Sequence, residues 1–116
     1  MGFTMQHDDL QAVAYRILRY SDLCAKADVW PSGYKALEVA CASATCAESA
    51  MRDLLRCGYI SPECAVTLKG AEYMGTNAGM GKARKLHGPS FDASLESAIE
   101  ATRMMPGSCP DWMREA

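Results

Sequence analysis

The chain lacks long apolar runs and lacks a large excess of charge of either sign, and each absence excludes a class of protein. Its longest apolar stretches are only a few residues, so no segment is expected to span a bilayer. The 12 basic and 14 acidic residues give a formal net charge of -2 at pH 7, which argues against a protein that coats nucleic acid by charge alone. The start of the sequence shows no charged segment followed by an apolar one. We therefore expect no secretory signal and predict a cytoplasmic location.

Cysteine is plentiful, but the spacing that metal sites require is missing. The 6 cysteines include no C-x-x-C pair, and the two histidines, His7 and His87, lie near no pair of cysteines. We therefore expect no metal site. Without an export signal, the thiols are expected to be reduced and to pack as small apolar groups. A redox-sensing regulator that uses Cys46 or Cys64 stays open as an alternative.

Familiar catalytic arrangements are missing as well. The acidic residues are scattered singly over predicted helices, where a solvent-exposed position is the simpler interpretation. The glycine-rich stretch has five residues between Gly75 and Gly81, and Ala83 stands where a phosphate loop needs Ser or Thr. We therefore expect no enzyme activity, no catalytic residue and no cofactor.

Apolar residues recur at helical spacing along much of the chain, which predicts a mainly α protein. Ser32 is expected to cap the second helix. Thr45 and Glu48 match a capping box at the start of the third helix, and Gly58 stands where a left-handed residue ends it. The predicted helices cover residues 8–26, 33–42, 45–57 and about 90–105.

The chain after Gly58 predicts a short β-hairpin. Residues 59–61 and 65–68 each fit a short strand, and Pro62 with Glu63 fits the turn between them. A short helix or turn is expected to follow, over residues 69–74.

Residues 33–74 resemble the winged-helix regulators of bacteria. In that family the recognition helix ends in Gly, a hydrophobic pair starts the hairpin, and a Leu-Thr-x-x-Gly-like segment closes it. Here residues 54–60 end in Gly-Tyr-Ile, and residues 66–70 read Val-Thr-Leu-Lys-Gly. The resemblance implies a winged helix-turn-helix with a short β-hairpin and an added C-terminal helix.

Three regions are predicted on this basis. Residues 1–74 form the winged helix-turn-helix domain with its N-terminal helix, residues 75–89 form a glycine-rich basic linker, and residues 90–116 form a C-terminal helix and tail. A last helix beyond a linker often packs back on the first helix or swaps onto a second subunit. We therefore predict a homodimer through the first and last helices.

The resemblance implies that the helix at 45–57 recognises double-stranded DNA in transcriptional control. Arg52 suits a bidentate contact with guanine, whereas Glu48 and Asp53 oppose the phosphate backbone. The exposed face of this helix is expected to contain Thr45, Cys46, Ser49, Arg52 and Arg56. Phosphate contacts are expected from Lys35, Lys69, Lys82, Arg84 and Lys85.

A protein-interaction module is the alternative function. The acidic balance, the short hairpin and a C-terminal part that carries Met and Trp favour a protein partner. Small inhibitors or adaptors of host proteins that are encoded by phages and mobile elements are often built in this way. The two functions stay open from sequence alone.

Overall fold

The protein is mainly helical, which confirms the mainly α part of the prediction. The structure is a computed structural model, and it describes residues 7–40, 43–76 and 93–115. No helix in these ranges is both long enough and apolar enough to cross a membrane. The helices are α1 (His7–Lys26), α2 (Gly33–Val39), α3 (Ala44–Cys57), α4 (Leu68–Thr76) and α6 (Trp112–Glu115). Residues 93–102 are also helical.

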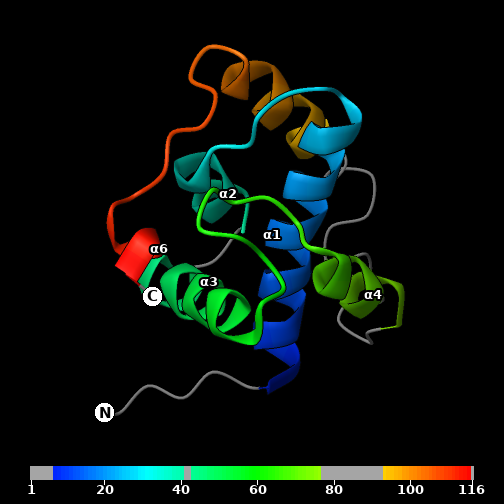
Figure 1. Cartoon of the computed structure of the whole chain (residues 1–116), viewed down its shortest axis with the longest axis vertical. Helices are drawn as coiled ribbons and strands as arrows, with labels where there is room; N and C mark the ends of the chain where they lie inside the picture. The colour runs from blue at the N-terminus through cyan, green and yellow to red at the C-terminus, as the bar shows by residue number, and fades with distance from the viewer. Residues whose placement is uncertain (1–6, 41–42, 77–92, 116) are drawn as a thin grey trace.

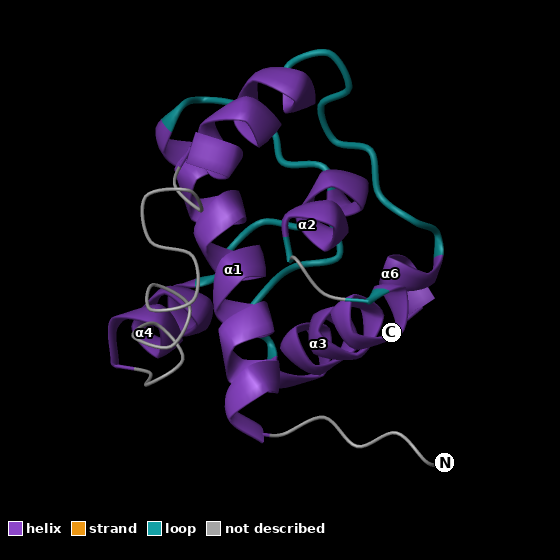
Figure 2. Cartoon of the chain, turned by 180° about the vertical axis from the view of Figure 1, so that it is seen from behind, coloured by secondary structure: helices purple, strands orange, loops and turns teal. Residues whose placement is uncertain are grey.

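Helix α1 is the central element of the fold. Helices α2 and α3 pack on one side of it and α4 packs on the other (Figures 1 and 2). Residues 12–18 are therefore all buried, including Arg16, which is only 4% exposed. The Arg16 Nη1 atom donates to the carbonyl of Ala40 at 2.8 Å, directly after the end of α2. Helix α2 thus ends at Val39, three residues before its predicted end.

The hydroxyl of Tyr20 connects α1 to two distant parts of the chain. It accepts a hydrogen bond from the backbone N–H of Ser32 at 3.0 Å, and it lies 2.7 Å from the Oγ1 atom of Thr102. Thr102 in turn donates to the carbonyl of Ala98 at 2.7 Å. Burial raises the pKa of Tyr20 far above its usual range. Residues 93–102 therefore pack on α1 of the same chain.

The helix caps follow the sequence prediction at two positions and depart from it at one. Ser32 caps α2, and Gly58 ends α3 with φ 76°, as predicted. The assignment of Thr45 as the N-cap of α3 is wrong. Instead, the Oγ atom of Ser43 accepts from the N–H of Cys46 at 3.2 Å, so the helix starts earlier. Ser43 lies in extended backbone three residues before Cys46, so its hydroxyl can accept from the N–H of Cys46 and cap the helix.

The predicted β-hairpin is wrong. Over residues 7–40, 43–76 and 93–115 the chain forms no strand, and only one antiparallel bridge joins Ile60 to Val66. No ladder forms, because α3 ends at Cys57 and α4 begins at Leu68, which leaves few residues to pair beyond this bridge. The carbonyl of Ser61 accepts from Cys64 at 2.8 Å, and its Oγ atom accepts from the N–H of Ala65 at 3.1 Å.

A helix cap replaces the second strand. The Oγ1 atom of Thr67 accepts from the N–H of Gly70 at 3.0 Å and donates to the carbonyl of Gly58 at 2.6 Å. Helix α4 therefore begins at Leu68, within the segment expected to be extended. Because a Thr at this position can cap a helix as well as enter a strand, the winged-helix prediction fails here.

The C-terminal tail packs on α2 and ends in α6. The N–H of Gly33 donates to the carbonyl of Ser108 at 2.7 Å. A Cβ atom at Gly33 would lie 2.7 Å from the Sδ atom of Met113 and 3.1 Å from the Sγ atom of Cys109. Met113 is fully buried at this contact. Because glycine has no side chain, the tail can pack closely against Gly33 and contribute to the core around α1.

Candidate functional site

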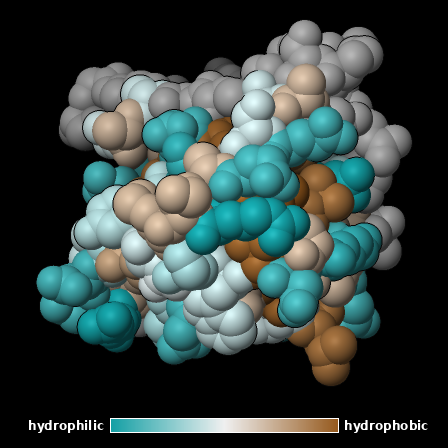
Figure 3. Space-filling view, turned by 90° about the horizontal axis from the view of Figure 1, so that it is seen from above, coloured by the Kyte–Doolittle hydropathy of each residue, from teal (hydrophilic) through white to brown (hydrophobic). Residues whose placement is uncertain are grey.

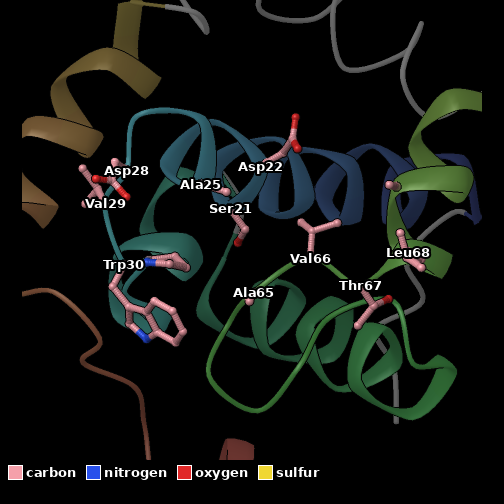
Figure 4. A pocket seen from close by; sticks show the side chains of 12 residues that line it. Ser21, Asp22, Ala25, Asp28, Val29, Trp30, Ala65, Val66, Thr67 and Leu68 are labelled. Atoms are coloured by element: carbon pink, nitrogen blue, oxygen red, sulfur yellow. The ribbon is translucent and has the colours of Figure 1, made fainter.

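A groove of about 620 Å³ lies between the second half of α1 and the segment that leads into α4 (Figure 4). We call it the apolar groove. Trp30 lies at one end of it and Leu68 at the other, with Val66 between them. Because Trp30 is 57% exposed and Leu68 is 88% exposed, the groove is open to solvent. Its walls come from α1 (Ser21, Asp22, Ala25), from residues 28–31 and from residues 65–68 with Ala71.

The end of α1 positions the Trp30 end of the groove. Asp28 takes a left-handed conformation with φ 60°, and the next N–H, that of Val29, donates to the carbonyl of Cys24 at 2.8 Å. This is the hydrogen bond of a Schellman helix end. The indole then rests on Gly107, where a Cβ atom would lie 2.9 Å from its Cδ1 atom. Trp30 is therefore held in place although more than half of it is exposed.

The start of α4 positions the Leu68 end. Leu68 is the first residue of α4, directly after the Thr67 cap, so its side chain projects away from the core. A leucine with this exposure is unusual when other apolar groups are close to it, because it leaves an apolar patch in water. In the view from above, apolar atoms come to the surface between hydrophilic ones (Figure 3).

The buried thiol of Cys64 lies beside one residue of the groove lining. The Oγ atom of Ser21, a lining residue, lies 3.4 Å from the Sγ atom of Cys64. Burial raises the pKa of Cys64 to about 12, so the thiol is neutral near pH 7. Cys46 was expected on the exposed face of its helix, but it is only 8% exposed. Both thiols of the redox alternative are thus buried, which removes the exposure that a redox sensor needs.

Other cysteines and acidic residues offer no metal site in the described ranges. The five cysteines described there, Cys24, Cys46, Cys57, Cys64 and Cys109, all carry free thiols. No group of three or more His, Cys, Asp or Glu side chains in those ranges is placed to hold a metal ion.

The charge on the rim of the apolar groove is negative. Asp22 and Asp28 are among its lining residues, and none of the lining residues that the structure describes is Lys, Arg or His. Asp22 forms an ion pair at 3.0 Å with Lys26, which lies one turn further along α1. Asp28 is exposed at the Trp30 end. The groove therefore combines apolar walls with an acidic edge.

The predicted DNA-binding face of α3 forms a second surface. Thr45, Ser49, Arg52 and Arg56 are all exposed, and their spacing places them on one stripe of the helix. Both arginines have neighbours in the same chain. The Cζ atom of Arg52 lies 4.4 Å from the ring centroid of Trp112 in α6, and Arg56 pairs with Asp53.

The remaining predicted phosphate contacts do not join this stripe. Lys35 forms an ion pair with Glu38 on α2 at 2.9 Å. The Nζ atom of Lys69 lies 5.6 Å from the ring centroid of Tyr59, which stacks on Tyr73 at 4.5 Å. Lys82, Arg84 and Lys85 lie outside the described residues, as does most of the predicted linker at 75–89.

Sequence reasoning missed the apolar groove. Nothing in the sequence marked Leu68 as exposed, because an apolar residue in a predicted strand is expected to be buried. The two ends are also 38 residues apart in the sequence, so no local pattern joins them.

Comparisons with known proteins add no further information. No protein-family model matches the chain, and no curated protein and no solved structure matches it. The winged-helix resemblance therefore gains no support. The apolar groove and the exposed stripe of α3 are the features that bear on function.

Proposed function

We propose that this protein is an interaction module, without catalytic activity of its own, that binds a protein partner through the apolar groove. One observation carries the proposal: Trp30 and Leu68, 57% and 88% exposed, stand at the two ends of a groove of about 620 Å³. Exposed apolar side chains around a hollow are typical of binding surfaces.

The energetics favour occupation of this groove by apolar side chains. Burying a large apolar side chain such as Leu68 stabilises a complex by about 1.5–3 kcal/mol. Trp is among the residues that most often dominate binding energy. Because Trp30 is already held by Gly107, little side-chain freedom is lost on binding.

A library of random peptides displayed on phage tests the proposal. The full chain is expected to select peptides with large apolar residues. Leu68→Asp is expected to weaken their binding about tenfold or more, because it replaces the apolar contact with a charge. The folded state should tolerate this change, since Leu68 is 88% exposed and an acidic residue suits the first turn of a helix.

The matched control is Met104→Asp. Met104 is as exposed as Leu68, at 83%, but it is not part of the groove lining. The substitution Met104→Asp should therefore leave peptide binding unchanged. If the library yields no binder, or if both variants weaken binding equally, the groove is not the binding surface.

The predicted homodimer and the cytoplasmic location stay predictions. Residues 12–18 of α1, which was expected to contribute to the dimer, are buried within their own chain, as are Leu95 and Ile99 of the last long helical segment. The groove is an exposed apolar surface on which a second copy can pack. Sedimentation of the full chain and of Leu68→Asp tests this, since a dimer held by the groove should dissociate in the variant.

DNA binding through α3 is the second candidate. The exposed stripe of Thr45, Ser49, Arg52 and Arg56 supports it, because two arginines and two hydroxyl groups face outward together. Because the carboxylate of Asp53 pairs with Arg56, it weakens the attraction of Arg56 for phosphate. The net charge of -2 adds no general attraction.

Fluorescence anisotropy with a labelled random duplex at low and at physiological salt tests this second candidate. If α3 binds DNA, Arg52→Ala should reduce the binding free energy by about 1–3 kcal/mol. Glu48→Ala should leave affinity equal or higher, and Lys26→Ala, on α1, is the control. No measurable affinity at low salt would exclude DNA as the partner.

A further inference from the structure

We infer that the apolar groove binds an extended peptide that pairs with the backbone of Val66 and carries a large apolar side chain next to Lys or Arg. This inference rests on the proposed function, since it names the partner that the groove would take. Three features of the groove support it: an open backbone edge, an acidic rim and apolar groups along its length.

The backbone edge at Val66 faces away from Ile60, its partner in the antiparallel bridge. The hydrogen bonds of the bridge come from the flanking residues: Ser61 N–H donates to the carbonyl of Ala65 at 2.8 Å, and Thr67 N–H donates to the carbonyl of Tyr59 at 3.2 Å. In such an antiparallel pair the N–H and C=O of the central residue point to the opposite edge.

These two groups of Val66 have no hydrogen-bond partner within residues 7–40, 43–76 and 93–115. Val66 is also a lining residue of the groove, between its two ends (Figure 4). An unpaired edge beside an apolar groove is the arrangement that binds peptides by strand addition. The turn at 61–64 keeps this edge short, so it pairs with a peptide without forming a long sheet.

The acidic rim selects for basic residues in the peptide. Asp28 lines the groove, as does Asp22, which is paired with Lys26 at 3.0 Å, and none of the lining residues in the described ranges is Lys, Arg or His. An acidic peptide would meet the like charge of Asp28 here, whereas Lys or Arg beside the apolar anchor would meet an opposite charge. Charge complementarity therefore distinguishes the expected partner from other extended peptides.

The apolar groups suit an extended chain. Trp30 and Leu68 stand at opposite ends of the groove, and Val66 lies between them. In an extended peptide, alternate side chains point to the same face. A peptide paired with Val66 can therefore place apolar side chains into the groove and basic ones toward the aspartates.

NMR titration of the full chain with three short synthetic peptides tests the inference. The first peptide has lysines on both sides of a central leucine, the second has glutamates in place of the lysines, and the third repeats the first with N-methylated backbone amides. The first should shift the amide resonance of Val66 and the indole resonance of Trp30. The second and third should each bind about tenfold more weakly.

Asp28→Asn is the matched protein variant. Asparagine accepts the left-handed conformation of Asp28, so the fold should be kept while the charge is lost. It should weaken binding of the lysine peptide several-fold, and Asp111→Asn, an exposed carboxylate outside the groove, should not.

The outcomes separate this inference from the proposed function. If the N-methylated peptide binds as well as its parent, or if the glutamate peptide binds equally well, the inference fails. Peptides from the random library that still depend on Leu68 would then leave the proposed function standing. If no peptide shifts Val66 or Trp30 and no library peptide depends on Leu68, both fail.

Discussion

Gly70→Ala is expected to destabilise the protein by about 3 kcal/mol, although Gly→Ala inside a helix usually stabilises it by about 1 kcal/mol. A Cβ atom at Gly70 would collide with the carbonyl oxygen of Tyr59 and lie 2.9 Å from its carbonyl carbon. The backbone of Tyr59 cannot move away freely. Its N–H donates to the carbonyl of Leu54 at 2.9 Å, and its carbonyl accepts from Thr67 at 3.2 Å.

Urea unfolding measures this loss, with Gly58→Ala as the control. Gly58 has φ 76°, but a Cβ atom there would meet nothing within 4 Å. Its replacement should cost only the strain of the left-handed conformation, about 1 kcal/mol. The close approach of α4 to Tyr59 is disproved if Gly70→Ala is neutral, or if it costs less than Gly58→Ala.

Alkaline pH is expected to remove on the order of 3 kcal/mol of stability by about pH 11 through the Cys64 thiol alone. The thiol of the unfolded chain ionises near its ordinary pKa of 9.0, whereas burial raises the pKa in the folded state to about 12. The protonated Cys64 thiol therefore makes its full contribution to the free energy of unfolding below about pH 9. This contribution is lost as the pH rises toward 12, because the unfolded chain releases its proton first. Burial also raises the pKa values of Tyr20, Cys24 and Cys109, which adds to the loss.

Urea midpoints of the reduced protein at several pH values between 7 and 11 test this dependence. Cys64→Ala should be less stable than the wild type at pH 7, but its free energy of unfolding should fall less than that of the wild type as the pH rises. Cys57→Ala, which removes an exposed thiol, should follow the wild-type slope. Equal slopes in the wild type and in Cys64→Ala would show that this thiol does not cause the loss.

The caps show how far sequence reasoning extends. Ser32 and Gly58 were predicted correctly because each acts on backbone groups within a few residues of itself. Thr45 was misassigned because Ser43 offers the same hydroxyl two residues earlier, and the sequence does not say which one the helix uses. At Thr67 the competing outcomes were a strand and a helix cap, and the hydrogen bond to Gly58 favours the cap.

The candidate site was predictable only in part. Helical spacing explains why Thr45, Ser49, Arg52 and Arg56 share an exposed stripe of α3, whereas Cys46, expected on the same face, is buried. The contact of Arg52 with Trp112 was not predictable, because 60 residues separate them in the sequence. Neither was the apolar groove, which needs α1 and the start of α4 to lie side by side.

The sequence by itself determined the helical character of this protein, most helix limits and two of its caps, because these depend on neighbours within one or two turns. The tertiary structure decided which side chains are buried. It placed Arg16 and Cys46 inside and left Leu68 outside, against what their residue types or positions suggested. The physical reason is that burial depends on contacts between segments far apart in the chain. Those contacts also create the groove on which the proposed function rests.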